Sequence, residues 1–226
     1  MKKILVFIAL ACSAMVTAQD SSKTVQLEDF NEIKVFDGIS VTLIKADENK
    51  AVISGEDISD VALVIRNGRL KVRMEIDKVF TGHRSFVEIY YKDRLDVIDV
   101  NENAFLSSED VIEQTSIELK AQEGAEMNVR LDTQKVDVLS TSGGKIEATG
   151  DSITQDVIIT SGGQYEGDRL KTEQSYIRVN AGGTGYVNAS ELVEARVRAG
   201  GTVRIHGKPK VIDKKTFLGG KIIEMD

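Results

Sequence analysis

The residues of this sequence that could take part in chemistry are charged side chains that recur at a nearly fixed spacing in its second half. A tripeptide ending in two glycines returns about every 19 residues, and the residue six positions before its first glycine is usually acidic. The residue four positions before that glycine is basic in the last repeats, at Arg178, Arg196 and Lys215. If each repeat forms one layer of a stack, these columns become parallel rows of opposite charge on one face.

The arginines and tyrosines of the later repeats are the predicted ligand-binding residues. Guanidinium groups bond sulfate, carboxylate and phosphate in a forked geometry, and aromatic planes stack on sugars. We therefore predict contact with a glycan or another cell-surface polymer through Tyr165, Tyr176, Arg178, Arg196, Arg198 and Arg204. The alternative is a solvated face of mixed charge, in which each surface ion pair contributes little.

Catalytic and metal-binding signatures are absent from the sequence. His83 and His206 are the only histidines, and no Gly-x-Ser-x-Gly, His-Glu-x-x-His or Cys-x-x-Cys motif occurs. One acidic residue per repeat supplies too few oxygens at one point for Ca²⁺. We predict a non-enzymatic protein without metal or cofactor, and a net charge of −7 argues against a nucleic-acid partner. A polysaccharide-processing enzyme with an unrecognised site is the leading alternative, and a structural envelope protein that self-associates into a homo-oligomer is another.

The elements that position these residues are short strands joined at the glycines. On both sides of each Gly-Gly pair, every second residue is mostly apolar or small, which is typical of strands with one buried face. The spacing predicts an all-β fold, a single-stranded parallel β-helix with coils of about 19 residues. Corners between its faces need positive φ or a close backbone approach, so we predict corner roles for Gly143, Gly144, Gly162, Gly163, Gly182, Gly183, Gly200, Gly201, Gly219 and Gly220.

The N-terminal part has less regular strands. We expect one β-helical domain over residues 28–226, with irregular strands over 28–94 and regular coils over 95–226, after a flexible segment over 19–27. Asn67-Gly68 lies between two apolar runs and predicts a two-residue hairpin, since both residues tolerate positive φ. Such a hairpin would cap the first open edge of the helix.

The first 18 residues predict a secretory signal peptide. A basic start at Lys2 and Lys3 precedes an apolar run, and small residues precede a cleavage site between Ala18 and Gln19. A lipid anchor on Cys12 is the alternative reading of this segment. The mature chain has no second apolar stretch long enough to span a membrane.

The segment Phe30-Asn31-Glu32-Ile33-Lys34-Val35, the following Phe36-Asp37-Gly38-Ile39-Ser40-Val41-Thr42-Leu43, the Gly-Gly repeats and the signal peptide together resemble the head GIN domain family. The resemblance covers residues from about 28 to 223, and the third position of the Gly-Ile-Asn motif is Ser40 here. The family is described as auto-transporter adhesins, is also catalogued as a domain of unknown function, and is common in exported proteins of Bacteroidetes. It implies a β-helical fold, an adhesive or glycan-binding role, and export in a Gram-negative bacterium to the periplasm, the outer-membrane surface or the medium.

Overall fold

A computed structural model describes residues 22–79 and 81–225. The predicted signal peptide, its cleavage site at Ala18 and Gln19, and Cys12 lie outside the described residues. Of the segment expected to be flexible over residues 19–27, the structure places Lys23–Gln26 in strand β1, which pairs antiparallel with β4 (Lys50–Gly55). In the described part of the chain, no helix is long and apolar enough to cross a membrane.

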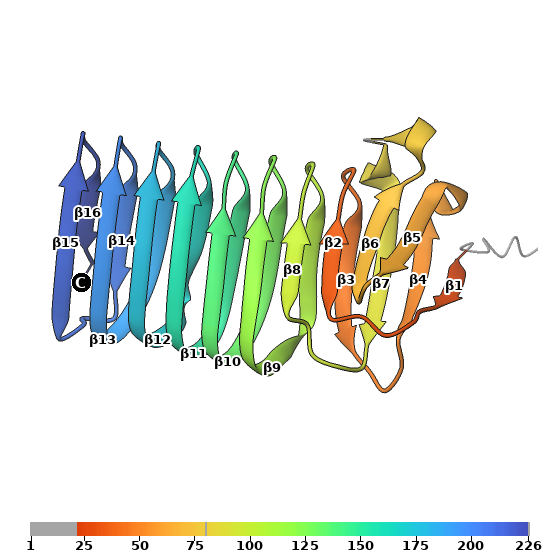
Figure 1. The fold of residues 1–226 in the computed structure, drawn as a ribbon, viewed down its shortest axis with the longest axis horizontal. Helices are drawn as coiled ribbons and strands as arrows, with labels where there is room; N and C mark the ends of the chain where they lie inside the picture. The colour runs from red at the N-terminus through yellow and green to blue at the C-terminus, as the bar shows by residue number, and fades with distance from the viewer. Residues whose placement is uncertain (1–21, 80, 226) are drawn as a thin grey trace, which may run out of the picture.

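The second half of the chain winds into a solenoid of parallel strands (Figure 1). Each regular coil runs along one face, bends, returns along the opposite face and reverses in a tight turn. Residues of successive coils pair at a spacing of about one repeat, as in the series Val138, Val157 and Ile177. The predicted parallel β-helix is thereby confirmed. Its strands are β8 (Val97–Val100), β9 (Phe105–Ala121), β10 (Glu126–Ser140), β11 (Lys145–Thr160), β12 (Gln164–Asn180), β13 (Thr184–Arg198), β14 (Thr202–His206), β15 (Val211–Phe217) and β16 (Lys221–Glu224).

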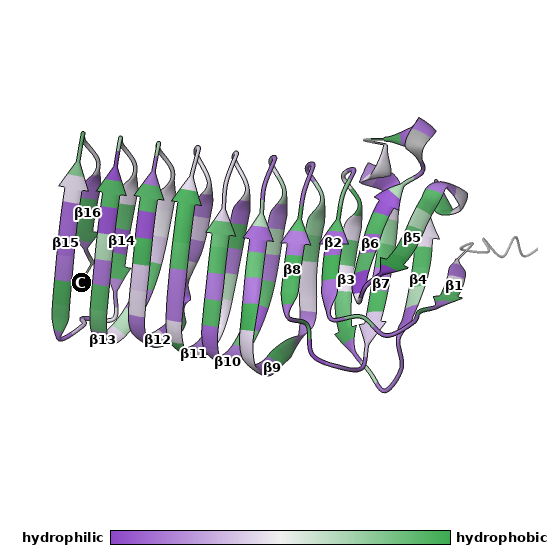
Figure 2. Cartoon of the chain, viewed as in Figure 1, coloured by the Kyte–Doolittle hydropathy of each residue, from purple (hydrophilic) through white to green (hydrophobic). Residues whose placement is uncertain are grey.

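The solenoid has two opposed sheets that share long bent strands. The front sheet, which faces the viewer in Figure 1, contains the second halves of β9 to β13 together with β8 and β15. The back sheet contains the first halves of β9 to β13 together with β14 and β16. Side chains alternate along every strand, so Met127, Val129 and Val138 of β10 lie in the core between the sheets. Figure 2 shows the alternation as bands of opposite hydropathy.

The N-terminal strands extend both sheets and close their first edges. β6 (Arg69–Met74) pairs with β2 (Glu32–Val35) in the front sheet, and β5 (Val61–Arg66) pairs antiparallel with β6. In the back sheet, β3 (Ser40–Lys45) pairs with β7 (Ser85–Tyr91), which pairs antiparallel with β4. Between β5 and β6, Asn67 and Gly68 have φ of 51° and 73°, as a type I′ turn requires. The predicted hairpin and its position at the end of the solenoid are confirmed. Short 3-10 turns are formed by Ile58–Asp60, Ile76–Lys78 and Gly82–Arg84.

The two glycines of each tight turn occupy different environments. In the turn after β10, Ser142 and Gly143 have φ of 50° and 77°, and the amide of Gly144 donates to the carbonyl of Thr141 at 2.9 Å. A Cβ on Gly143 would meet nothing within 4 Å, whereas a Cβ on Gly144 would lie 2.2 Å from the carbonyl oxygen of Ala121 in the preceding coil. The first glycine therefore serves the turn conformation, and the second serves the close stacking of coils.

The last coil departs from the apolar pattern of the core. Lys214 aligns with buried Ala195 of the preceding coil, and Glu224 aligns with buried Ile205. Their side chains form an ion pair of 2.6 Å between Nζ and Oε1, and both are about half exposed. Positions that hold apolar residues in the other coils thus hold a paired lysine and glutamate here.

Candidate functional site

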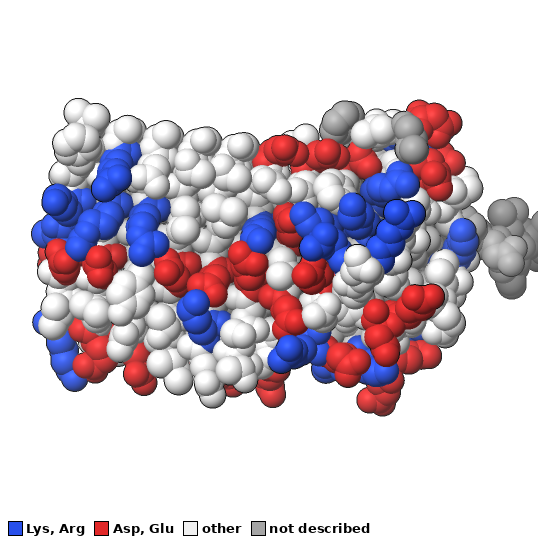
Figure 3. All heavy atoms as spheres, viewed as in Figure 1, with Lys and Arg blue, Asp and Glu red and all other residues white. Residues whose placement is uncertain are grey.

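The front sheet places charged side chains in two parallel rows. Arg178, Arg196 and Lys215 are in register on adjacent strands and form a basic row at the C-terminal end of the sheet. The next residue in register beyond Arg178 is Ile158. The acid row lies two residues earlier on the same strands and consists of Glu118, Asp137, Asp156, Tyr176, Glu194 and Asp213. Figure 3 shows the basic side chains gathered above the acidic ones over β12, β13 and β15.

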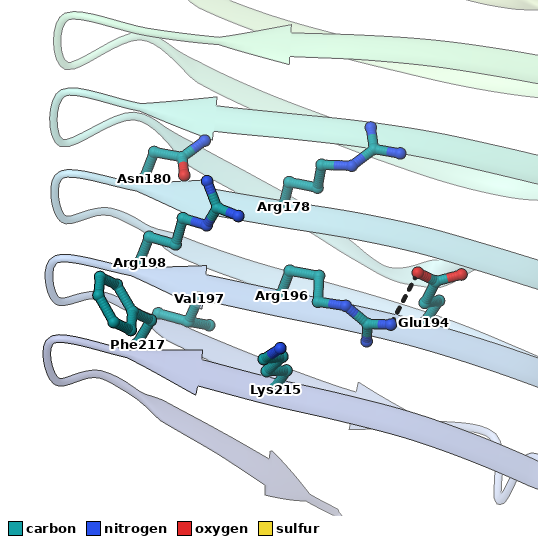
Figure 4. A pocket seen from close by; sticks show the side chains of 8 residues that line it. All are labelled: Arg178, Asn180, Glu194, Arg196, Val197, Arg198, Lys215 and Phe217. Carbon is teal, nitrogen blue, oxygen red and sulfur yellow. Dashed lines mark ion pairs between the residues drawn. The ribbon is translucent and has the colours of Figure 1, made fainter.

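A groove of about 630 Å³ lies over the basic row. It is lined by Arg178, Asn180, Glu194, Arg196, Val197, Arg198, Lys215 and Phe217. In Figure 4 the polar side chains and Phe217 come from neighbouring strands of one sheet, and Arg196 points toward Glu194 and away from Arg198. Val197 is buried on the core side of that sheet. The floor of the groove is therefore a sheet of hydrogen-bonded strands, which fixes the backbone positions of these side chains.

The cations of the groove differ in how they are paired. Arg196 pairs with Glu194 at 2.9 Å and also with Asp213, and the hydrogen bond to Asp213 raises the pKa of Arg196 above its usual value. Arg178 pairs with Asp156 at 3.3 Å. Within the described residues, Arg198 and Lys215 form no ion pair and no side-chain hydrogen bond. These two cations are available to an anionic ligand.

An exposed aromatic ring lies beside the two unpaired cations. Phe217, the last residue of β15, is 60% exposed and aligns with Arg198 of β13. Asn180 aligns with Arg198 on the other side, and its half-exposed amide has no side-chain partner in the described part of the chain. Charge, an apolar ring and an amide thus lie within three adjacent strands.

Tyr165 is not a surface residue, and its predicted role in glycan contact is wrong. Its side chain is 0% exposed because it points into the core from β12. The hydroxyl donates to Oε1 of Gln155 at 2.8 Å, and Nε2 of Gln155 donates to Oγ of Ser175 at 2.7 Å. Burial raises the pKa of Tyr165 far above its usual value, so the hydroxyl stays protonated and acts as a donor inside the core.

Arg204 lies on the opposite sheet from the other predicted arginines. Its position follows a tight turn, on β14, whereas Arg178, Arg196 and Arg198 precede one. Its guanidinium lies 5.1 Å from the ring centroid of Tyr186, and Nη1 donates to the Tyr186 hydroxyl at 3.1 Å. The back sheet therefore carries a separate cation–aromatic contact, and the predicted set of six residues is not one site.

Tyr176 stays on the front sheet but belongs to the acid row. It is half-buried, and its hydroxyl donates to Oε1 of Gln174 at 3.1 Å. The structure thus brings together Arg178, Arg196 and Arg198, with Tyr176 at the edge of the group. Sequence reasoning did not assign Asn180, Lys215 and Phe217 to the site. Asn180 and Phe217 lie two residues before the first glycine of their repeats, in the same column as Arg198. This column would have identified both residues.

A second group of acids lines the tight turns near the N-terminal end. Asp37 and Glu102 occupy equivalent turn positions with φ of 62° and 53°, and the amide of Gly38 donates to the carbonyl of Glu102 at 2.9 Å. Asp37 is buried and accepts a hydrogen bond from the Met74 amide at 2.9 Å. Burial, and then the neighbouring Asp37, raises the pKa of Glu102 above its usual value of 4.5.

We expect Glu102→Gln to raise the melting temperature at pH 7. The pKa of Glu102 is higher in the folded than in the unfolded state, so its ionised form destabilises the fold above that raised pKa. This destabilisation decreases as the pH falls from the raised pKa toward about 4.5, and it is absent below that value. The difference in melting temperature between the variant and the wild type should therefore decrease as the pH is lowered. Thermal unfolding at several pH values measures it, with Glu173→Gln, an exposed carboxylate at the bend of β12, as the control. Equal melting temperatures of wild type and E102Q at pH 7 would contradict the expectation.

No group of three or more His, Cys, Asp or Glu side chains that could hold a metal ion occurs among residues 22–79 and 81–225. His206 ends β14 and lies half-buried beside Tyr186, with ring centroids 6.3 Å apart. His83 packs against the turn at Gly38, where a Cβ would lie 2.6 Å from its ring. The two histidines therefore lie on different parts of the solenoid and do not form one site.

Comparison with known proteins identifies relatives of the sequence and the fold. Residues 29–209 match the family described as "Putative auto-transporter adhesin, head GIN domain". A crystal structure described as a "putative adhesin" from Bacteroides fragilis is similar with a TM-score of 0.83 and 16% identity, covering 91% of this chain and 96% of that one. Another from Parabacteroides distasonis has a TM-score of 0.74 and 21% identity, with the same coverage. No curated protein matches the sequence.

Proposed function

Because the chain belongs to the head GIN domain family, we propose that it is an exported, non-enzymatic surface protein that binds an acidic glycan or similar cell-surface polymer in the front groove. The observation that carries the proposal is the pair of unpaired cations, Arg198 and Lys215, beside the exposed ring of Phe217. The adhesin descriptions of the family and of the similar structures support an adhesin-like surface protein. The apolar leader of the sequence supports export.

The chemistry of the groove fits an anionic sugar. Arg198 and Lys215 can bond a carboxylate or sulfate, and Phe217 offers its face to the apolar side of a sugar ring. Asn180 can donate to and accept from hydroxyl groups. The groove lies on the outer face of the front sheet, as expected for a site that holds part of a long polymer.

We expect Arg198→Ala/Lys215→Ala to weaken binding of acidic glycans about tenfold, since each exposed charge contact contributes up to about 1 kcal/mol. A glycan array with the purified mature protein identifies ligands, and titration at several salt concentrations measures the loss, which should shrink as salt screens the charges. The matched control is Arg130→Ala/Lys171→Ala, which removes two exposed cations outside the groove that form no ion pair in the described residues.

Four results would contradict this proposal. Absence of any glycan binding would remove it. Equal losses in the groove variant and in the control variant would show a non-specific charge effect. Release of shortened products from polysaccharides such as pectin or alginate would favour the enzyme instead, and a concentration-dependent sedimentation shift without ligand would favour self-association.

A further inference from the structure

We propose that the ligand is a linear acidic polysaccharide that lies along the solenoid axis, across the strands, and reaches a second basic cluster at the N-terminal end of the front sheet. This inference rests on the proposed function of the groove and adds the shape, direction and length of the ligand.

Strand register extends the basic row beyond the groove. From Lys215, Arg196 and Arg178 the row continues through Ile158 and Leu139 to Lys120, Asp99, Lys34 and Lys71. The nine residues occupy adjacent strands, so eight steps of ~4.8 Å give a span of ~38 Å from Lys215 to Lys71. A compact ligand could not contact both ends.

The N-terminal end of this row is a second basic cluster. It consists of Lys34, Arg69, Lys71, Arg73 and Lys120 on β2, β6 and β9. Lys34 pairs with buried Asp99 at 2.5 Å and Lys120 pairs with Glu118 at 2.9 Å, whereas Lys71 forms no ion pair within the described residues. Figure 3 shows this group and the groove cations as two basic areas on one face, at similar height, with uncharged surface between them.

The surface between the clusters is apolar and hydroxylated. Leu139 is half-buried and Ile158 is 38% exposed in the basic row. Thr160 lies in the column that continues to Asn180 and Arg198, and Thr141 directly follows the end of β10. Apolar side chains next to hydroxyl and amide groups suit the two kinds of surface on a sugar ring.

This uncharged centre favours a polysaccharide over a nucleic acid. A single-stranded nucleic acid is held by cations along its backbone and by aromatic rings on which its bases stack. Between the two clusters the row offers the aliphatic side chains of Ile158 and Leu139, and the acid row, including Asp137 and Asp156, lies parallel to them. The acid row would repel a polyanion from the lower half of the face and confine it to the upper half.

The test measures affinity against ligand length. Oligogalacturonates serve as the probe because each sugar carries one carboxylate, and the series runs from lengths that fill only the groove to lengths above ~38 Å, the span between the clusters. We expect affinity to rise at least about tenfold once the oligomer reaches both clusters, because the second contact becomes intramolecular. Lys71→Ala/Lys120→Ala should reduce that rise to less than about twofold and leave short-oligomer affinity unchanged.

Two further variants test the surface between the two clusters and the effect of charge alone. Leu139→Asp places an acid at the midpoint of the nine-residue row, two strands away from Arg178 of the groove, so it should remove the gain of the long oligomers without weakening the short ones. Arg130→Ala/Lys171→Ala has the same charge change as the cluster variant and should keep the full gain. Circular dichroism and melting temperature confirm that each variant is folded.

The outcomes distinguish this inference from the proposed function. Short oligomers that bind without any rise at greater length would overturn the axial path and leave the groove in place. No binding at any length, combined with a negative glycan array, would overturn both proposals. Thymidine oligonucleotides of matched length that bind as tightly as the oligogalacturonates, with the same dependence on the two clusters, would overturn the assignment to polysaccharide.

Discussion

Gly144→Ala is expected to destabilise the protein by about 3 kcal/mol or more, and Gly143→Ala, one residue earlier, by only about 1 to 2 kcal/mol. The added Cβ at position 144 would lie 2.2 Å from a backbone oxygen of the preceding coil, so two stacked coils must move apart. At position 143 the methyl group meets nothing within 4 Å, and the cost is that of holding alanine at a φ of 77°. Urea unfolding at equilibrium measures both.

The pair of variants forms its own control, because the chemical change and the turn are the same. A smaller loss at Gly144 than at Gly143 would show that turn conformation, and not contact between coils, limits these positions. An unchanged m-value would show that the variants alter stability and not the unfolded chain.

Tyr165→Ala is expected to destabilise the protein by about 3 to 5 kcal/mol, because it removes a fully buried aromatic ring. Tyr165→Phe keeps the ring and removes the donor to Gln155, so a buried acceptor is left unsatisfied at a cost of about 1 to 3 kcal/mol. Both values come from chemical denaturation. A phenylalanine variant as stable as wild type would show that Gln155 finds another donor.

Gly167 supplies a further check on the same ring. A Cβ at Gly167 would lie 2.5 Å from the Tyr165 ring, so Gly167→Ala should destabilise the wild type. In the Tyr165→Ala background the ring is absent and the same substitution should cost little. The two effects should therefore be strongly non-additive in a double-mutant cycle, as expected for residues in contact. Simple additivity would contradict the packing described for the ring.

Much of the fold could be predicted from the sequence because the repeat is a local signal. The Gly-Gly turns and the alternation of apolar residues around them identify coils, and the columns that contain Val138 and Val157 are buried as expected. Asn67-Gly68 identifies the hairpin for the same reason, because a two-residue turn requires only that its own two residues adopt positive φ. The strand β1 was missed because Lys23–Gln26 is polar and gains its order from pairing with β4, which is distant in sequence.

The site was harder to predict because it depends on which face each column occupies. Tyr165 stands three residues after a first glycine, in a column of core residues, yet its aromatic character led to a surface role. Arg204 also follows its turn and therefore lies on the other sheet from Arg178. Ion pairing adds a second difficulty, since Arg196 and Arg198 are two residues apart and only the structure shows that Arg196 is held by Asp213.

The charged pair in the last coil lies at the edge where a further coil would have to stack. Parallel coils with an apolar interior can in principle add further coils without limit, in the way that cross-β fibrils elongate. A coil from any chain laid over β15 and β16 would remove Lys214 and Glu224 from water, and desolvating an ion pair can cost more than the pair regains by mutual attraction. Inward-pointing charges are a known protection of sheet edges, so Lys214 and Glu224 oppose the addition of a further coil at the C-terminal edge, as the hairpin closes the N-terminal one.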